Sequence, residues 1–242
     1  MPRFINHLSV AALTALVSAC AAAPSSESAA KAPVPADPFL WLEDVSAERS
    51  LDWARGHNTK SSGELVDGEF KTLETRLKAI LDSEEKIPYV GKIGGFYYNL
   101  WQDAKNPRGL WRRTTPDEYA KAEPAWETVL DVDALGKAEG VSWVWHGASV
   151  LEPEDRLCLL SLSPGGSDAD VVREFDLSTK SFVEGGFHVP EAKSSVGWRD
   201  QDSLWVGTDF GPDTMTESGY PRQAKLWKRG TPLESAETVY EG

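Results

Sequence analysis

Residues 157–177, Leu-Cys-Leu-Leu-Ser-Leu-Ser-Pro-Gly-Gly-Ser-Asp-Ala-Asp-Val-Val-Arg-Glu-Phe-Asp-Leu, hold the pattern on which the fold depends. The stretch opens with an apolar, strand-like run (157–163) and closes with a second run (169–177) in which apolar and polar residues alternate. Pro164-Gly165-Gly166 lies between them, and this composition is typical of a tight turn. The sequence therefore predicts a β-hairpin at this point.

The same stretch contains the nearest match in the chain to the G-x-S-x-G elbow of serine hydrolases, Gly165-Gly166-Ser167-Asp168-Ala169. An elbow places its serine between a strand and a helix, but here the final glycine is missing and a second strand follows. The chain also lacks the alternation of strands and helices that a hydrolase sheet requires. Ser167 is therefore interpreted as a turn residue, and no catalytic residue is assigned.

The alternating pattern recurs on both sides of this hairpin, with turn residues between the runs. Many short strands joined by tight turns are typical of a sandwich, a barrel or a propeller. The predicted strands cover residues 96–101, 110–114, 127–131, 142–145, 157–162, 171–177, 196–199, 204–208 and 224–228.

Tryptophan spacing favours the propeller among these mainly β folds. Trp101, Trp145 and Trp198 are about 50 residues apart, close to the period of some propeller blades. Residues 87–242 then provide about three blades, whereas a propeller closes with typically four to eight. We therefore predict an incomplete β-propeller with an open blade face, in a fragment or a self-associating piece.

Residues 37–86 change to a helical pattern, which predicts a short helical segment before the propeller. A first helix is expected from residue 48 to residue 54, ended by Gly56. A second carries an apolar stripe of Phe70, Leu73, Leu77, Ile80 and Leu81 on one face.

The N-terminus reads as an export signal. Residues 1–19 hold a ten-residue apolar core (8–17), too short for the roughly 20 residues of a membrane span. Val17-Ser18-Ala19-Cys20 resembles the lipobox of bacterial lipoproteins, so Cys20 is predicted to carry a lipid; the alternative is ordinary secretion with Cys20 as a plain thiol. Residues 20–36 are rich in Ala, Ser and Pro and are expected to be a lipid-anchored linker. The expected location is the periplasm or cell envelope, anchored to a bacterial membrane.

Composition narrows the possible partners. The chain has 242 residues with 25 Lys and Arg against 38 Asp and Glu, a formal net charge of -13. This balance argues against nucleic acid as a partner, because phosphate neutralisation needs clustered cations. Scattered histidines and only two cysteines give no metal-ligand spacing, so no metal or cofactor is expected. Cys158 lies in the apolar run and is predicted to be a buried core thiol.

Carboxylate pairs are interpreted as solvated loop and turn residues rather than as an acid–base pair. They fall at residues 131–133, 152–155 and 200–202.

Several motifs together resemble the N-terminal part of the prolyl oligopeptidase family of serine peptidases, and they occur in that family's order. The motifs are DPFLWLED (37–44), Trp53 with Asn58, NPRGLWRR (106–113), WETVLD (126–131), LSLSPGGSD (160–168), REFDL (173–177), TESGYPR (216–222) and WKRGTP (227–232).

The resemblance implies a helical N-terminal segment, a seven-bladed β-propeller and an α/β-hydrolase domain that cleaves short peptides. It implies that residues 37–86 pack against the hydrolase domain, and that the propeller restricts access of peptide substrates to it. The catalytic Ser, Asp and His of such an enzyme would lie beyond Gly242, so this portion alone should be inactive. The alternative function is a catalytically inactive, propeller-like binding or scaffold lipoprotein. A structural lipoprotein unrelated to peptidases fits the ordered motifs less well.

Overall fold

The computed structural model describes residues 37–242, which fall into two compact units, one ending at Leu65 and the other spanning Val66–Gly242. The first holds the 3₁₀ helix η1 (Leu40–Glu43) and helix α1 (Glu48–Leu65). The Ser50 hydroxyl donates to the Trp41 carbonyl at 3.0 Å, and the Trp41 and Trp53 rings meet edge to face at 6.4 Å. These contacts fix η1 against the first turns of α1.

The prediction that Gly56 ends the first helix is wrong, because α1 runs on to Leu65. A glycine inside a helix costs only about 1 kcal/mol relative to alanine, so flanking interactions can carry the helix through it. Arg55 lies 2.6 Å from the carboxylate of Glu48 and 2.9 Å from that of Asp52. The prediction of a second helix is confirmed by α2 (Gly68–Leu81), whose N-terminus is capped by Asp67.

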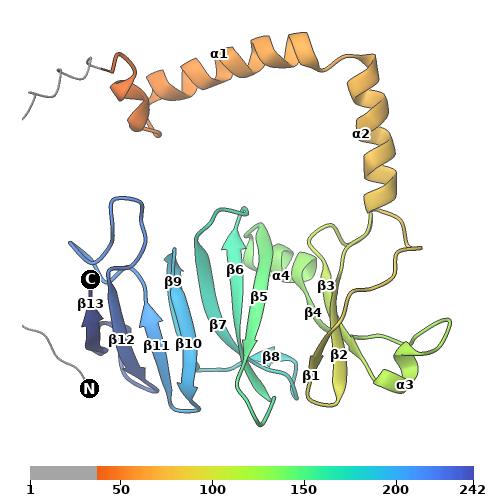
Figure 1. The fold of residues 1–242 in the computed structure, drawn as a ribbon, viewed down its shortest axis with the longest axis vertical. Helices are drawn as coiled ribbons and strands as arrows, with labels where there is room; N and C mark the ends of the chain where they lie inside the picture. The colour runs from red at the N-terminus through yellow and green to blue at the C-terminus, as the bar shows by residue number, and fades with distance from the viewer. Residues whose placement is uncertain (1–36) are drawn as a thin grey trace, which may run out of the picture. The chain divides into compact units, whose positions relative to one another are not determined.

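Three antiparallel sheets follow one another along the chain of the second unit (Figure 1). Sheet A contains β1 (Gly91–Ile93), β2 (Phe96–Trp101), β3 (Leu110–Thr114) and β4 (Glu127–Asp131). Sheet B contains β5 (Trp143–Val150), β6 (Leu157–Pro164), β7 (Asp170–Asp176), β8 (Ser181–Phe182) and β9 (His188–Ala192). Sheet C contains β10 (Ser195–Asp200), β11 (Ser203–Gly207), β12 (Gln223–Lys228) and β13 (Glu237–Glu241).

Sheet B is packed on both faces, which explains the nearly continuous apolar run in β6. Cys158 and Leu160 join Tyr98 and Trp111 of sheet A in one core cluster. Leu159 points to the other face and joins a second cluster with side chains of sheet C, including Leu204, Val206 and Trp227. A strand that is buried on both faces needs apolar residues at odd and even positions alike.

All nine predicted strands are present, and the three sheets confirm the expected partial propeller. Trp101, Trp145 and Trp198 fall in sheets A, B and C respectively. The short elements β1, β8, β9, β13, α3 (Pro116–Tyr119), α4 (Val132–Glu139) and η2 (Leu233–Ser235) were not predicted as separate elements. β8 has two residues, and β1 and η2 have three each, which is too few to show a periodicity. In β9, Pro190 interrupts the strand pattern.

A buried ion pair joins sheet B to the turn after β12. The side chain of Glu174 on β7 is completely buried, and its two oxygens accept from Arg229 Nη1 at 2.7 Å and Nη2 at 2.9 Å. The Phe187 amide also donates to Glu174 at 2.8 Å. This bidentate pair therefore fixes how sheets B and C pack together.

Candidate functional site

Ser167 lies in a hairpin turn, as the sequence predicts. Gly165 and Gly166 adopt positive φ angles of 74° and 88°, and β7 begins at Asp170. The Ser167 hydroxyl lies 3.4 Å from the Ser163 hydroxyl and accepts from the Ala169 amide at 3.3 Å. These neighbours include no histidine, so the described part of the chain gives Ser167 no base to activate it.

Cys158 is the buried thiol that the sequence predicts. Its side chain is fully enclosed between sheets A and B and lies 3.6 Å from the Phe175 carbonyl. Burial raises the pKa of the thiol far above its usual value, so it stays protonated and unreactive. Cys20, the predicted lipidation site, lies outside the described residues.

Two of the carboxylate pairs stabilise local structure, in agreement with their interpretation as loop and turn residues. Asp131 caps α4 by accepting from the Ala134 amide at 2.8 Å. Asp200 accepts from the Asp202 amide at 2.9 Å. Within residues 37–242, no three His, Cys, Asp or Glu side chains gather as metal ligands would.

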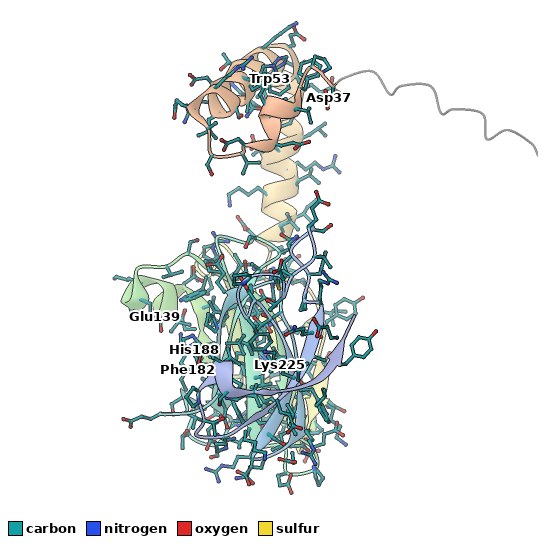
Figure 2. All side chains as sticks on the ribbon, turned by 90° about the vertical axis from the view of Figure 1, so that its left-hand side faces the viewer. Asp37, Trp53, Glu139, Phe182, His188 and Lys225 are labelled. Carbon is teal, nitrogen blue, oxygen red and sulfur yellow. The ribbon has the colours of Figure 1, made fainter. Side chains whose placement is uncertain are left out.

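A cluster of polar and aromatic side chains lies where α4 meets sheet B, and Figure 2 labels three of its members, Glu139, Phe182 and His188. Arg173 lies 3.5 Å from the centre of the Phe182 ring, and Nη1 donates to both Glu139 oxygens, at 2.8 and 3.0 Å. Arg173, Phe182 and His188 line a cavity of about 300 Å³. Burial lowers the pKa of His188. The charge of Arg173 is already balanced by Glu139, so this cluster stabilises the sheet and offers no free binding group.

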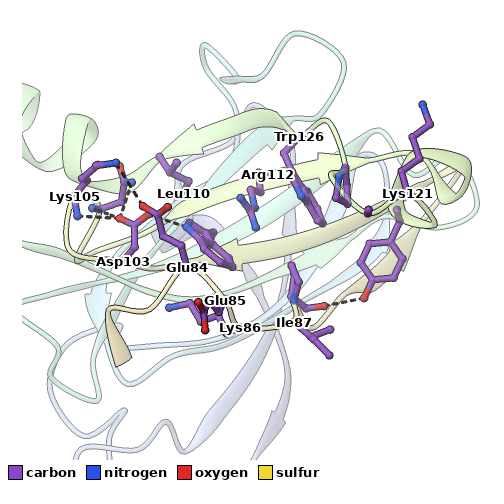
Figure 3. Close-up of a pocket in the computed structure, with 16 residues that line it drawn as sticks. Glu84, Glu85, Lys86, Ile87, Asp103, Lys105, Leu110, Arg112, Lys121 and Trp126 are labelled. Atoms are coloured by element: carbon purple, nitrogen blue, oxygen red, sulfur yellow. Dashed lines mark hydrogen bonds and ion pairs between the residues drawn. The ribbon is translucent and has the colours of Figure 1, made fainter. Parts of the chain in front are cut away.

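A cavity of about 860 Å³ lies on the face of sheet A that points away from sheet B (Figure 3). Tyr98, Leu100 and Trp111 point toward sheet B, so the alternation of the strands places Trp101 and Arg112 on the opposite face. We call this the open face of sheet A. Its lining also includes Glu84, Glu85, Lys86, Ile87, Asp103, Lys105, Leu110, Tyr119, Lys121 and Trp126.

Arg112 is at the centre of this cavity. Its guanidinium carbon lies 4.2 Å from the centre of the Trp101 ring and 4.3 Å from that of Trp126, which are cation–π distances. Nε donates to the Asn99 side chain at 3.1 Å. Burial lowers the pKa of Arg112 to about 10, while the charge of Asp103 opposes this effect only in part. The guanidinium is therefore partly desolvated without a carboxylate partner.

Asp103 lies beside Arg112 but is occupied by other groups. Its carboxylate accepts from Trp101 Nε1 at 2.8 Å, from the amides of Lys105 and Asn106 at 2.9 and 2.8 Å, and from the Asn106 side chain at 2.9 Å. These bonds, led by that of Trp101, lower the pKa of Asp103 to about 2. Asp103 therefore holds the loop after β2 and orients Trp101.

The cavity has the chemistry of a binding site. It offers a cation, two indole rings and exposed apolar side chains, and its described lining holds no Ser, Cys or His. Sequence reasoning missed Arg112 because Arg112 and Arg113 are adjacent and chemically identical. The available signal was the alternation within 110–114, which places the two arginines on opposite faces.

Comparison with known proteins gives a consistent result. Residues 23–242 match the family described as "Prolyl oligopeptidase, N-terminal beta-propeller domain". The chain is 40% identical over 209 residues to the "Uncharacterized peptidase y4nA" of Sinorhizobium fredii (strain NBRC 101917 / NGR234), covering 85% of this chain and 29% of that protein. It is 33% identical over 213 residues to the "Uncharacterized peptidase RP174" of Rickettsia prowazekii (strain Madrid E), covering 83% and 29%.

A solved structure gives the same result at the level of the fold. A "Post-proline cleaving enzyme from Rickettsia typhi" superposes with a TM-score of 0.76 at 33% identity, covering 84% of this chain and 30% of that one. The chain therefore spans less than a third of the length of these relatives.

Proposed function

The chain belongs to the prolyl oligopeptidase family, because it matches the N-terminal propeller domain of that family. We propose that it is the portion of a serine-type oligopeptidase that controls access of substrates to the active site. In this proposal the propeller restricts access of short peptides to a hydrolase domain that lies outside residues 1–242. The catalytic Ser, Asp and His belong to that domain, and this portion alone does not hydrolyse peptides.

The observation that carries the proposal is the match to a peptidase over 209 residues, which make up only 29% of that peptidase. The relatives' remaining length leaves room for a second domain. A propeller that covers such a domain excludes large substrates by size, which accounts for a preference for short peptides.

The apolar stripe of α2 supports the presence of a docking partner. Phe70, Leu73, Leu77 and Leu81 line a groove of about 580 Å³, and each side chain is at least 45% exposed. Lys78 and Asp82 pair with each other at the rim at 2.6 Å. Contiguous apolar surface rimmed by charge is typical of an interface, and we assign it to the hydrolase domain.

The test begins with the native product. An antibody against residues 37–242 should precipitate, from cells that encode the chain, a product more than three times its length that reacts with a fluorophosphonate. The purified 242-residue chain should neither react nor cleave proline-containing peptides. A native product of about 26.5 kDa, folded and unreactive, would instead favour the scaffold function.

The α2 stripe provides a second readout in the long product. Leu77→Asp should leave the isolated chain folded, because Leu77 is exposed, but should lower peptidase activity by weakening docking of the hydrolase domain. Thr75→Asp, which adds the same charge to another exposed position of α2, serves as the matched control. Equal activity of the two variants would contradict the assignment of the stripe.

We further propose that Cys20 carries a lipid and that the protein is exported and anchored to a bacterial membrane. The support is the order of apolar core, lipobox and linker in residues 1–36, all before the described residues. Among the described residues, no helix combines the length and apolar composition needed to cross a membrane. Radiolabelled fatty acid should enter the wild-type protein and not Cys20→Ala, and equal labelling of both would contradict the proposal.

A further inference from the structure

Two adjacent arginines on β3 differ sharply in how their charge is satisfied. Arg113 donates to the Glu127 carboxylate at 2.6 Å, to the Tyr98 hydroxyl at 3.2 Å and to the Leu177 carbonyl at 3.0 Å. Arg112 has only the bond to Asn99 and its two aromatic contacts. Among residues 37–242, no carboxylate oxygen lies within 4.0 Å of its guanidinium nitrogens. The Nη groups of Arg112 therefore have no acceptor among the described residues, which leaves the donors of a partly buried cation available to an anion.

The carboxylates that line the cavity do not reach Arg112. Asp103 accepts four hydrogen bonds, from Trp101, Lys105 and Asn106. Glu84 lies 3.5 Å from Lys105. Glu85 also lines the cavity, but no carboxylate oxygen of the described residues lies within 4.0 Å of the Arg112 guanidinium nitrogens. The described lining therefore leaves Arg112 without an anion.

The contacts of Arg112 also restrict the shape of that anion. The guanidinium carbon lies over the Trp101 and Trp126 rings, and Nε donates to the Asn99 side chain, so the Nη groups are the donors without a partner. The remaining Nη groups present parallel N–H donors in one plane, which match the two oxygens of a carboxylate.

The surroundings indicate where this carboxylate is attached. The open face of sheet A continues into Ile87 and Tyr89, which are 83% and 95% exposed. The Tyr119 hydroxyl and the Asn99 side chain hold this segment in place through the carbonyls of Pro88 at 3.0 Å and Tyr89 at 2.8 Å. In a propeller each blade packs between two others, as sheet B does here, so a second blade is expected on this face.

We propose that Arg112 is a carboxylate-binding site, and that its occupant is an Asp or Glu side chain, flanked by apolar residues, on the blade that closes the propeller against sheet A. The proposal rests on the propeller assignment within the proposed function but not on peptidase activity. The ion pair of Arg112 with this carboxylate makes the contact specific for the closing blade and fixes its register. The aromatic and apolar surface around Arg112 provides the contact area.

The experiment uses the 242-residue chain and two blocked peptides, acetyl-Leu-Glu-Leu-amide and acetyl-Leu-Gln-Leu-amide. Binding is followed through the indole N–H signals of Trp101 and Trp126 in NMR titrations. The Glu peptide should bind at least about tenfold more tightly than the Gln peptide, because only the carboxylate forms a charged, bidentate pair. Arg112→Gln should remove this difference, and Arg112→Lys should restore only part of it.

Lys121→Gln is the matched control, because it removes a cation from the rim of the same cavity but not from the site. It should change the affinity for the Glu peptide by less than about twofold. Circular dichroism establishes that each variant is folded. Equal binding of the two peptides by the wild type, or an unchanged preference in Arg112→Gln, would overturn the carboxylate site.

Two further measurements separate the sources of the carboxylate. A Leu-Gln-Leu peptide with a free C-terminal carboxylate should bind less tightly than the Glu peptide; tighter binding would make the occupant a peptide terminus and overturn the blade assignment. Sedimentation velocity of wild type and Arg112→Gln should give the same degree of association. Association lost only in Arg112→Gln would make the occupant a second copy of the chain. None of these measurements depends on peptide hydrolysis, so they test the carboxylate site independently of the proposed peptidase function.

Discussion

Asp103 makes the stability of the loop after β2 sensitive to acid. Its pKa is about 2 in the folded chain, held below the ordinary value of 3.8 mainly by the hydrogen bond from Trp101. A group with a lowered folded pKa stabilises the protein above its unfolded pKa, and this contribution is lost as the pH falls through the folded pKa. We therefore expect Asp103→Asn to be less stable than wild type at pH 6, with the difference shrinking between about pH 4 and pH 2.

Urea denaturation across this pH range measures the effect. Glu123→Gln is the control, because Glu123 is exposed and accepts no hydrogen bond among the described residues. Its stability difference from wild type should stay small throughout. A stability difference for Asp103→Asn that is constant from pH 6 to pH 2 would contradict the assigned role.

Glu174 should be one of the most sensitive positions in the chain. Its carboxylate is fully buried and binds Arg229 through two bonds, at 2.7 and 2.9 Å. Removing one partner of a buried pair leaves the other charge uncompensated and costs about 3–5 kcal/mol. Arg229 keeps some contact with solvent and also lies 3.5 Å from the Asp202 carboxylate, so its charge stays partly compensated. We therefore expect Glu174→Gln to fall at the lower end of that range in urea denaturation.

An exposed pair provides the comparison. Lys180 lies 2.7 Å from Glu127, and both side chains are partly open to solvent. Lys180→Met should therefore cost less than about 1 kcal/mol. Equal costs for the two variants would show that burial does not set the strength of the Glu174 pair.

Helices α1 and α4 both contain internal glycines, and alanine should have opposite effects at Gly56 of α1 and Gly136 of α4. A Cβ at Gly56 would have no heavy atom within 4 Å, whereas a Cβ at Gly136 would lie 2.7 Å from the Val141 carbonyl oxygen. Gly56→Ala should therefore stabilise α1 by about 1 kcal/mol, while Gly136→Ala should destabilise its unit.

Circular dichroism at 222 nm during thermal unfolding distinguishes the two variants. Gly56→Ala should raise the helical signal or the temperature at which α1 melts, and Gly136→Ala should lower the unfolding temperature. A destabilising effect of Gly56→Ala would mean that α1 is interrupted near Gly56, as sequence reasoning first suggested.

The open face of sheet C should make the isolated chain prone to association. Trp205 and Tyr240 line a cavity of about 390 Å³ on this sheet and remain 42% and 66% exposed. We expect the 242-residue chain to bind a hydrophobic dye and to associate as its concentration rises. Trp205→Ser combined with Tyr240→Ser should reduce both effects in dye titration and sedimentation.

The matched control replaces two exposed polar residues, as in Thr238→Ser with Glu241→Gln on β13. It should leave dye binding unchanged. A wild-type chain that stays monomeric, melts in one sharp transition and binds no dye would contradict the idea that sheet C lacks a neighbour.

The elements differ in how far they could be predicted from sequence. The hairpin of β6 and β7 was predictable because strand alternation and the turn at Gly165-Gly166 are both local signals. The end of α1 was not, because one glycine costs a helix only about 1 kcal/mol and does not by itself end it. Helix α4 was missed because its cap residue, Asp131, also ends a predicted strand.

Local pattern in the chain was sufficient for the nine predicted strands, the turn role of Ser167 and the burial of Cys158, because each depends on near neighbours or on simple alternation. The contrast between Arg112 and Arg113 emerged only from the packed sheets. Two identical adjacent side chains differ only in which face of sheet A is covered, and that depends on strand pairing and on residues such as Glu127 and Leu177. The binding site at Arg112 exists because long-range packing satisfied one arginine and left its neighbour open.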